Sequence, residues 1–339
     1  MSTIIQAYAV NKAGQNLEEW QYQADPLAAT DIEVHVTHNG LCHTDLHMRD
    51  NDWGITQYPL VPGHEVVGIV TKTGSQVTEI KKGDRVGFGW IRDSCRVCDH
   101  CLKGQENICR EGYSGLIVGH HGGFADRIVA PADFAYKIPD TLDSAHAAPL
   151  LCAGITVYTP LRTYLRHPAM KVGIIGVGGL GHLAIQFAHA MGAEVTAFST
   201  SPDKEDEARG FGAHHFKILG SETYQSLASS QDMILNTASS VIDWQACFDL
   251  LSNDGVLCIV GIPPASDITL PLTSMVFGQK KLAGSIVGGR HFMIEMLAMA
   301  AAHNIKPLIE TMPLSQVNEA MEKVARNQAR YRIVLTSNH

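Results

Sequence analysis

The sequence predicts an α/β fold made of a β-rich domain and a domain with a parallel sheet. Length is the first observation, because 339 residues suit two domains of about 150 residues each. The second is a series of short strands in the first 140 residues. The third is a regular alternation of strands and helices after residue 170.

The strands expected in the first half are apolar, short and bounded by glycine or proline, a pattern typical of antiparallel sheets. They cover residues 32–36, 66–71, 84–88 and 124–130. We expect this β-rich domain to comprise residues 1–150 together with the C-terminal residues 290–339.

The second domain, residues 151–289, follows a different pattern. Its first strand, residues 172–175, precedes a helix at 180–191 and a second strand at 194–199. Such alternation predicts parallel strands joined by helical crossovers. The later strands are expected at residues 233–235, 256–260 and 281–287.

A glycine motif stands at the first turn of this domain. Its members are Gly176, Gly178, Gly179, Leu180 and Gly181. In a G-x-G-x-x-G turn the first glycine permits a tight turn, the second admits a pyrophosphate, and the third packs helix against strand. The motif predicts a Rossmann dinucleotide-binding domain; the alternative is a glycine-rich turn without a ligand.

The strand after this motif ends at Ser199, where an NAD-binding domain usually carries an acidic residue that binds the ribose. Thr200, Ser201 and Lys204 follow, so hydroxyls and a cation stand where a carboxylate would repel a 2′-phosphate. The sequence therefore favours NADP(H) over NAD(H). The same residues could simply cap the next helix, and both roles are compatible.

Cys95, Cys98, Cys101 and Cys109 lie within fifteen residues, a spacing typical of tetrahedral structural zinc. Disulfides are one alternative, but the N-terminus has no signal-peptide pattern, which favours a reducing cytoplasm. An iron–sulfur cluster is another, but the spacing to Cys109 departs from the ferredoxin pattern. Unligated buried thiols are disfavoured by the polar residues between the cysteines.

The charge balance excludes two classes of partner. A net charge of −8 offers no basic patch for nucleic acid or an anionic membrane. The most apolar helical stretch, residues 291–303, is too short to cross a bilayer and contains Glu295. We therefore expect a soluble protein without nucleic-acid or membrane partners, and the missing signal-peptide pattern favours the cytoplasm.

Motifs along nearly the whole chain resemble the zinc-dependent medium-chain alcohol dehydrogenases, in particular their cinnamyl-alcohol dehydrogenase and aldehyde reductase branch. The motifs are GLCHTDLH (40–47), YPLVPGHEVVGIV (58–70), the four-cysteine segment, PLLCAGITVY (149–158), GVGGLGHLAIQFAHAMGAEV (176–195), FSTS with Lys204 (198–204) and ARYRIVL (329–335). The resemblance implies a GroES-like catalytic domain around a Rossmann domain, with the active site in the cleft and a homodimer.

The resemblance also implies a second, catalytic zinc bound by Cys42, His64 and Cys152, with a fourth position open to water or substrate. Such a zinc acts as a Lewis acid on an aldehyde or alcohol oxygen. Glu65 matches an acidic residue that approaches the metal during ligand exchange. Asp45 matches a carboxylate that orients the histidine. A salt bridge elsewhere is the alternative for both.

Further roles follow from the same resemblance. Thr44 matches the hydroxyl that contacts the substrate oxygen, and His47 the histidine that passes protons to solvent. The positions matched to the cofactor outside the glycine turn are His43, Thr156, Val260 and Arg332, the last at the pyrophosphate.

The expected reaction is hydride transfer between NADP(H) and medium-chain or aromatic aldehydes and their primary alcohols. Apolar side chains expected at the substrate are Trp53, Trp90, Ile91, Ile286 and Val287, although each could instead be core. Two alternatives stay open: an NAD-dependent polyol or formaldehyde dehydrogenase on the same scaffold, and a non-catalytic sensor that binds zinc and nucleotide.

Overall fold

A computed structural model describes residues 3–238, 243–261 and 269–337. The chain divides into two compact units. The first, here called the β-rich unit, comprises Met1–Cys152 and Gly288–His339; the second, the parallel-sheet unit, comprises Ala153–Val287. These bounds differ by two residues from the domain limits expected from the sequence.

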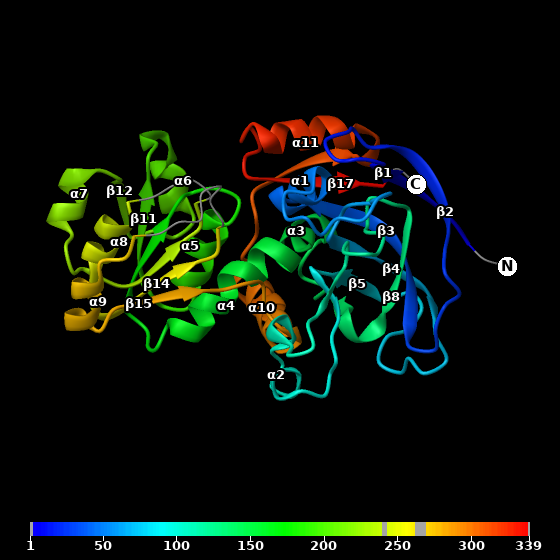
Figure 1. Ribbon diagram of the computed structural model, residues 1–339, viewed down its shortest axis with the longest axis horizontal. Helices are drawn as coiled ribbons and strands as arrows, with labels where there is room; N and C mark the ends of the chain where they lie inside the picture. The colour runs from blue at the N-terminus through cyan, green and yellow to red at the C-terminus, as the bar shows by residue number, and fades with distance from the viewer. Residues whose placement is uncertain (1–2, 239–242, 262–268, 338–339) are drawn as a thin grey trace. The chain divides into compact units, whose positions relative to one another are not determined.

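The β-rich unit is built on a mixed sheet in the order β16-β17-β3-β4-β5-β9, in which β8 also pairs with β3 (Figure 1). Its pairs are antiparallel except that of β16 with β17, which is parallel. The strands of the whole unit are β1 (Ile4–Ala9), β2 (Glu18–Gln23), β3 (Asp31–Leu41), β4 (Glu65–Thr73), β5 (Arg85–Phe88), β6 (Ile91–Asp93), β7 (Ser114–Gly115), β8 (Arg127–Pro131), β9 (Tyr136–Lys137), β16 (Ile309–Pro313) and β17 (Arg332–Thr336). Of these, β1 with β2 and β6 with β7 form two separate two-stranded sheets. Its helices are α1 (His43–Asp50), α2 (Asp99–Leu102), α3 (Ser144–Pro149), α10 (Arg290–His303) and α11 (Val317–Ala325).

The long strand β3 organises this sheet. One edge pairs with β4, while the other pairs with β8 near Asp31 and with β17 near Leu41. Alternate residues such as Val34 and Val36 are fully buried and form the core with Phe88. The C-terminal strand β17 thereby returns to the sheet beside the end of β3, from which the chain continues directly to Cys42.

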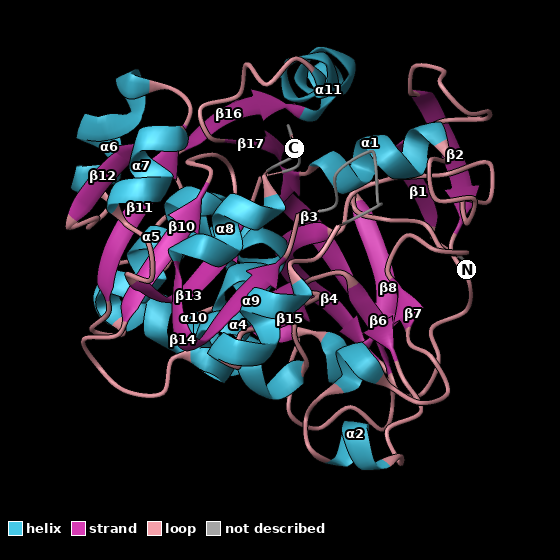
Figure 2. Ribbon diagram, turned by 60° about the vertical axis from the view of Figure 1, so that its left-hand side comes forward, coloured by secondary structure: helices cyan, strands magenta, loops and turns pink. Residues whose placement is uncertain are grey.

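The parallel-sheet unit has six parallel strands in the order β12-β11-β10-β13-β14-β15 (Figure 2). The strands are β10 (Lys171–Ile175), β11 (Glu194–Ser199), β12 (His215–Ile218), β13 (Gln231–Asn236), β14 (Leu251–Ile259) and β15 (Lys281–Gly284). The helices are α4 (Ile155–Tyr164), α5 (Gly181–Ala190), α6 (Glu205–Gly210), α7 (Ser221–Ser226), α8 (Trp244–Leu250) and α9 (Leu272–Gly278).

The strand order reverses between β10 and β13, which defines a doubly wound sheet. Right-handed crossovers on the two sides of this point place α5 and α8 on opposite faces. Ligands of such sheets bind beyond the carboxyl ends of the strands at the reversal. The glycine turn after β10 lies at that position, so the predicted Rossmann fold is confirmed.

Three predicted strand bounds need correction. The strand expected at residues 124–130 begins only at Arg127, since Phe124 and Ala125 instead bond to β1 through Tyr8 and Ala7. The last predicted strand, 281–287, ends at Gly284, and Val287 has a φ of +32°, outside strand geometry. The strand predicted at 256–260 begins earlier, at Leu251.

None of the helices that the structure describes combines the length and the apolar character needed to cross a membrane.

Candidate active site and metal centres

Four potential metal ligands converge inside the β-rich unit. Cys42 lies at the N-terminus of α1, and His64 and Glu65 lie at the start of β4. Cys152 lies in a π-helical turn, Leu150–Gly154, a local distortion frequent at functional sites. Their ligand atoms all lie within 4.8 Å of one another. The structure thus brings together the three residues expected from the resemblance.

The chemistry of this cluster fits zinc. His64 Nε2 lies 3.3 Å from Cys152 Sγ, close to the edge of about 3.5 Å that tetrahedral zinc gives an N and S ligand pair. Hydrogen bonds with Cys152 and with His64 hold the pKa of the Cys42 thiol well below its usual range. A low pKa favours the thiolate, the form that binds metal.

Asp45 orients the cluster through hydrogen bonds to His64 and to two backbone amides. Its carboxylate accepts hydrogen bonds from His64 Nδ1 at 3.0 Å, from the Gly63 amide at 2.9 Å and from the Cys42 amide at 3.0 Å. Since a carboxylate only accepts, His64 carries its proton on Nδ1 and directs Nε2 at the sulfur atoms. One fully buried side chain therefore fixes the loops that carry two of the ligands.

Glu65 is held by Arg332, the first residue of β17. The Arg332 guanidinium pairs with Glu65 Oε1, and both side chains are buried. Glu65 Oε2 has no hydrogen-bond partner among the described residues, and burial raises the pKa of this carboxyl to about 7. An orphaned carboxylate oxygen beside the ligands can approach a metal. Contact of Arg332 with the cofactor pyrophosphate stays a prediction, because its guanidinium here bonds to Glu65.

Helix α1 presents the residues expected to handle protons. Thr44 and His47 are three residues apart and so share one face of the helix, next to Cys42. His47 Nδ1 donates to Asp52 Oδ2 at 2.7 Å, and both side chains are partly exposed. Asp52 carried no signal in the sequence. The left-handed Asn51, which ends α1, turns the chain back so that Asp52 meets His47.

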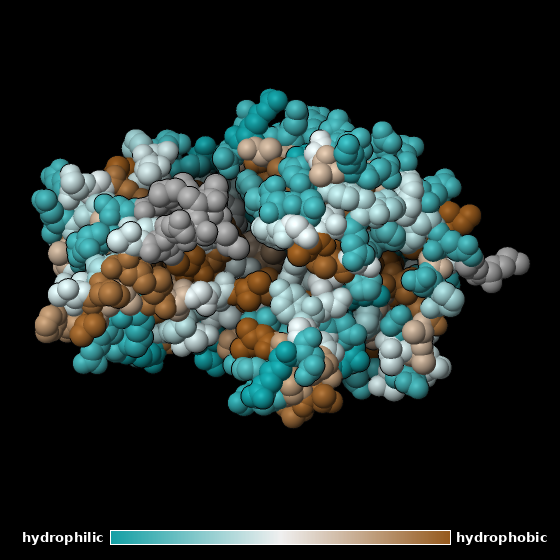
Figure 3. Space-filling view, in the orientation of Figure 1, coloured by the Kyte–Doolittle hydropathy of each residue, from teal (hydrophilic) through white to brown (hydrophobic). Residues whose placement is uncertain are grey.

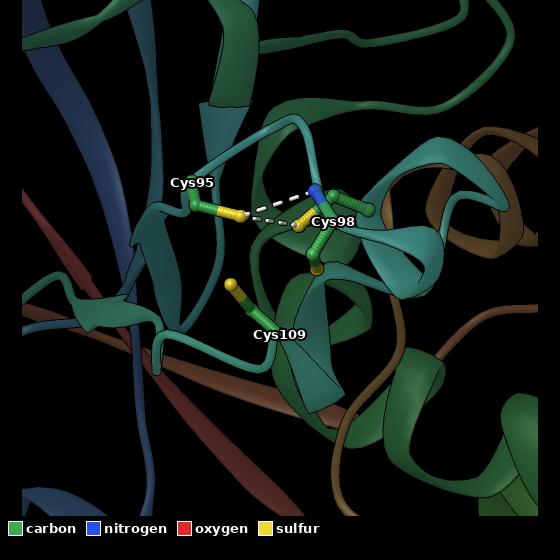
Figure 4. Close-up of side chains that lie close together, drawn as sticks. Cys95, Cys98 and Cys109 are labelled. Atoms are coloured by element: carbon green, nitrogen blue, oxygen red, sulfur yellow. Dashed lines mark hydrogen bonds between the residues drawn. The ribbon is translucent and has the colours of Figure 1, made fainter.

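The four-cysteine segment forms a separate cluster, with Cys95, Cys98, Cys101 and Cys109 within 4.8 Å of one another. Figure 4 shows the labelled sulfurs directed toward a common centre. The Sγ atoms of Cys95 and Cys101 are 3.8 Å apart. This distance equals the S–S edge of about 3.8 Å in a tetrahedral zinc site and excludes a disulfide. All eight cysteines are free, which also excludes the disulfide alternative.

Backbone amides support the four-cysteine cluster. The Cys98 amide donates to Cys95 Sγ at 3.4 Å. Backbone hydrogen bonds from Arg110 and Cys101 lower the pKa of the Cys98 thiol to about 6. Amides turned toward sulfur stabilise negative charge, so this loop is suited to hold thiolates around a metal.

The glycine turn of the parallel-sheet unit is shaped for a pyrophosphate. Gly176 has a φ of +90°, a left-handed conformation that favours glycine. A Cβ at Gly181 would lie 1.8 Å from the Gly176 carbonyl oxygen, whereas a Cβ at Gly178 would meet nothing within 4 Å. The third glycine is thus required for packing, and the second leaves open space at the helix N-terminus. Gly179 and Leu180 complete the turn into α5.

The residues expected at the adenosine ribose follow β11. Ser199 is its last residue and is buried, and its Oγ accepts from the Ser201 amide at 3.1 Å. Thr200 is exposed, and Lys204 ends a short 3-10 helix, Pro202–Lys204. The alternative that these residues cap the next helix is not supported. Neither Ser201, which precedes the 3-10 helix, nor Lys204, which precedes α6, makes a capping bond with its side chain.

The remaining predicted cofactor residues occupy several places. Thr156 is buried on α4, and Val260 directly follows β14, where its amide bonds to Asn236. His43 is exposed at the start of α1. Their roles stay predictions.

Comparison with known proteins places the chain in a family. Residues 28–140 match the alcohol dehydrogenase GroES-like domain, and residues 179–302 match the zinc-binding dehydrogenase domain. The chain is 43% identical to a probable formaldehyde dehydrogenase of Bacillus subtilis, with 96% of each protein covered. It is 41% identical to an aldehyde reductase of Synechocystis, over 98% of this chain and 99% of that protein.

Solved structures agree with this relationship. A cinnamyl alcohol dehydrogenase of Sorghum bicolor, 38% identical, superposes with a TM-score of 0.92 over 98% of both chains. A Helicobacter pylori enzyme of the same type, complexed with NADP(H), is 29% identical and gives a TM-score of 0.90 over 99% of both chains.

The chain therefore belongs to the zinc-containing medium-chain alcohol dehydrogenase family. It is an alcohol dehydrogenase of the oxidoreductase class, with a GroES-like domain, a Rossmann domain, two candidate zinc sites and a nicotinamide cofactor.

Proposed function

We propose that this protein uses NADP(H) to interconvert medium-chain or aromatic aldehydes and their primary alcohols, with zinc at Cys42, His64 and Cys152. The observation that carries the proposal is the convergence of these three ligands beside a carboxylate, Glu65, that Arg332 holds. Three protein ligands leave a position for a substrate oxygen, as catalytic zinc requires and structural zinc does not.

When bound, zinc would supply a Lewis acid for the carbonyl oxygen and the nicotinamide would supply or accept the hydride. The chain's own residues handle the proton. Thr44 places a hydroxyl on the first turn of α1, two residues after Cys42. Because Asp52 accepts the Nδ1 proton of His47 at 2.7 Å, Nε2 of that ring is the atom free to exchange protons. Partial exposure of His47 and Asp52 lets the relay reach solvent.

The NADP(H) preference rests on Ser199 at the end of β11. A carboxylate at this position would bind the ribose of NAD and repel the 2′-phosphate of NADP. A neutral hydroxyl followed by Lys204 favours the phosphate instead. The Helicobacter pylori relative, whose solved complex contains NADP(H), supports the same preference.

The Ser199→Asp variant tests this preference. We expect the KM for NADPH to rise by about tenfold or more, because a carboxylate would face the 2′-phosphate. The KM for NADH should change much less. Lys217→Ala, which removes an exposed lysine from the neighbouring strand β12, is the control and should leave the ratio unchanged. An unchanged ratio in Ser199→Asp would remove the argument for NADP(H).

The aldehyde preference rests on apolar side chains near the ligands. Trp90 and Ile91 are buried in the β-rich unit, and Trp53 is 39% exposed. Trp90 packs edge-on against the His64 ring at 5.5 Å between centroids. An aldehyde bound at the metal would meet these aromatic surfaces, which favour apolar chains. In the parallel-sheet unit, Val287 is buried and Ile286 is 48% exposed, and their part in substrate binding stays a prediction.

A homodimer is the proposed assembly. Helix α9 exposes Leu272, Val276 and Phe277, of which Phe277 is 86% exposed, and it packs against β14, next to the edge strand β15. Figure 3 shows apolar surface in this area. A second copy that covers the patch and continues the sheet would remove both apolar surface and a free strand edge. Phe277→Asp should shift the molar mass measured by light scattering from dimer to monomer.

The activity itself is tested by initial rates with NADPH and with NADH on cinnamaldehyde, benzaldehyde, hexanal and formaldehyde. We expect NADPH-dependent reduction of the first three and slow turnover of formaldehyde. Faster NAD-dependent oxidation of formaldehyde hydrate or of a polyol would instead favour the function for which the Bacillus subtilis relative is named. No turnover in either direction would favour a non-catalytic role.

A further inference from the structure

Two tryptophan rings, Trp90 and Trp53, form a continuous aromatic surface between His64 and His47, here called the aromatic wall. The Trp90 ring lies edge-on to two neighbours, with centroid distances of 5.5 Å to His64 and 6.3 Å to Trp53 and interplanar angles of 89° to both. Trp53 in turn lies 5.2 Å from His47. Trp90 is the buried member of this wall and Trp53 the partly exposed one. The orientation of Trp90 therefore determines the shape of the surface beside the ligands.

One short segment, residues 113–116, holds Trp90 at three points. The indole Nε1 donates to the Tyr113 hydroxyl at 3.0 Å. The Trp90 carbonyl accepts from the Leu116 amide at 2.7 Å. Gly115 lies beside the ring, because an added Cβ would be 3.4 Å from Trp90 Cζ2, at van der Waals contact. The backbone bond fixes the main chain of Trp90 and Gly115 only contacts the ring, whereas the Tyr113 bond acts on the polar edge of the ring.

We propose that Tyr113 is a positioning residue that determines substrate specificity by fixing the angle of the Trp90 indole. The proposal rests on the aldehyde-reducing function proposed above. A buried indole N–H needs an acceptor, so without the Tyr113 hydroxyl the ring gains by turning toward water or another polar group. A flat aromatic aldehyde depends on the angle of the ring it packs against, while a flexible aliphatic chain adapts to either angle.

Tyr113→Phe tests this inference, because it removes the acceptor and keeps the ring. The measurement is kcat/KM of the zinc-loaded enzyme for benzaldehyde and for hexanal with NADPH. We expect the ratio of benzaldehyde to hexanal to fall by about three- to tenfold, the range for loss of one neutral hydrogen bond. Tyr8→Phe, which removes an exposed hydroxyl from β1, is the matched control and should leave the ratio unchanged.

A double-mutant cycle distinguishes positioning through Trp90 from a general structural effect. In a Trp90→Phe background the ring has no N–H, so Tyr113→Phe should leave the ratio where Trp90→Phe alone has set it. Trp90→Leu, which also lacks an N–H, provides a second background should Trp90→Phe not fold. An equal fall in the ratio with and without the indole would overturn the proposal.

The role of Tyr113 and the proposed function are distinguished by the activity of the wild-type enzyme. A wild-type enzyme that reduces both aldehydes, with an unchanged ratio in Tyr113→Phe, would overturn the role of Tyr113 alone. A zinc-loaded wild-type enzyme that reduces neither aldehyde would overturn the proposed function and this inference with it.

Discussion

The two candidate zinc sites of the β-rich unit are built in different ways. The first takes Cys95, Cys98, Cys101 and Cys109 from one short segment near the surface, and two of its thiols are partly exposed. The second takes its ligands from three segments far apart in the sequence, at residues 42, 64–65 and 152, and His64 and Cys152 in it are buried. Local spacing makes the first cluster, whereas the tertiary fold makes the second.

This difference in construction corresponds to a difference in chemistry. Four thiolates close the coordination of zinc and hold a loop together, while two thiolates and one histidine leave a position for substrate. The second cluster also has buried supports: Asp45 behind His64, and Arg332 beside Glu65. The supports of the first are backbone amides and exposed ion pairs such as Asp99 with Arg110.

The second cluster, with the proposed zinc ligands Cys42, His64 and Cys152, is here called the catalytic cluster. The largest expected effect comes from Cys42→Ser, which removes one of its ligands. Turnover should fall by more than about a thousandfold, because the substrate oxygen loses its Lewis acid. NADPH binding, followed by cofactor fluorescence, should remain, since the glycine turn is untouched. Cys258→Ser, which alters a buried thiol outside both clusters, is the control. Wild-type rates in Cys42→Ser would refute the assignment of the catalytic metal.

The next effect concerns the other cluster. The four-cysteine cluster is here called the surface cluster. Cys109→Ser removes one of its buried ligands and should lower the free energy of unfolding by about 2–4 kcal/mol, measured by urea denaturation. Zinc content should fall by one atom per chain. The enzyme that remains folded should keep its kcat, since no ligand of the catalytic cluster is changed. Loss of kcat with unchanged stability would contradict the structural role.

Asp45→Asn is expected to have an intermediate effect. The amide keeps the shape of the side chain but can turn an N–H toward His64, which disturbs the tautomer that directs Nε2 at the metal. Zinc affinity of the catalytic cluster should fall by about 10- to 100-fold, the range for loss of a partner behind a metal ligand. Competition with a chromogenic chelator measures this affinity. Unchanged affinity would show that Asp45 does not orient the ligand.

Asp99→Asn makes the matching change beside the surface cluster and should have the smallest effect. Its ion pair with Arg110 is solvent-exposed, and such pairs contribute at most about 1 kcal/mol. Both the free energy of unfolding and the zinc content should stay near wild type. A loss as large as that of Asp45→Asn would remove the distinction between buried and exposed support.

The two clusters also differ in how far the sequence alone predicts them. The surface cluster follows from spacing, and the Rossmann sheet follows from the alternation of strands and helices with the glycine turn. The catalytic cluster has no such local signature. Cys152 stands among apolar residues, and only the resemblance pointed to it. Its convergence with Cys42 depends on the pairing of β3 with β4 and on the turn after α3.

Two contacts of the site had no sequence signal. Arg332 reaches Glu65 because β17 pairs with the end of β3, so residues 267 positions apart meet through the sheet. Asp52 meets His47 because Asn51 adopts a left-handed conformation after α1. Backbone pairing and helix termination decide both contacts, and neither is visible in the spacing of the side chains.

The most direct test of the central claim is the NADPH-dependent reduction of cinnamaldehyde before zinc removal, after removal by a chelator, and after zinc is restored. We predict that the rate is lost when zinc is removed and returns when zinc is restored, while Cys42→Ser gains no rate from added zinc. Full activity of protein shown by elemental analysis to lack zinc would contradict the account.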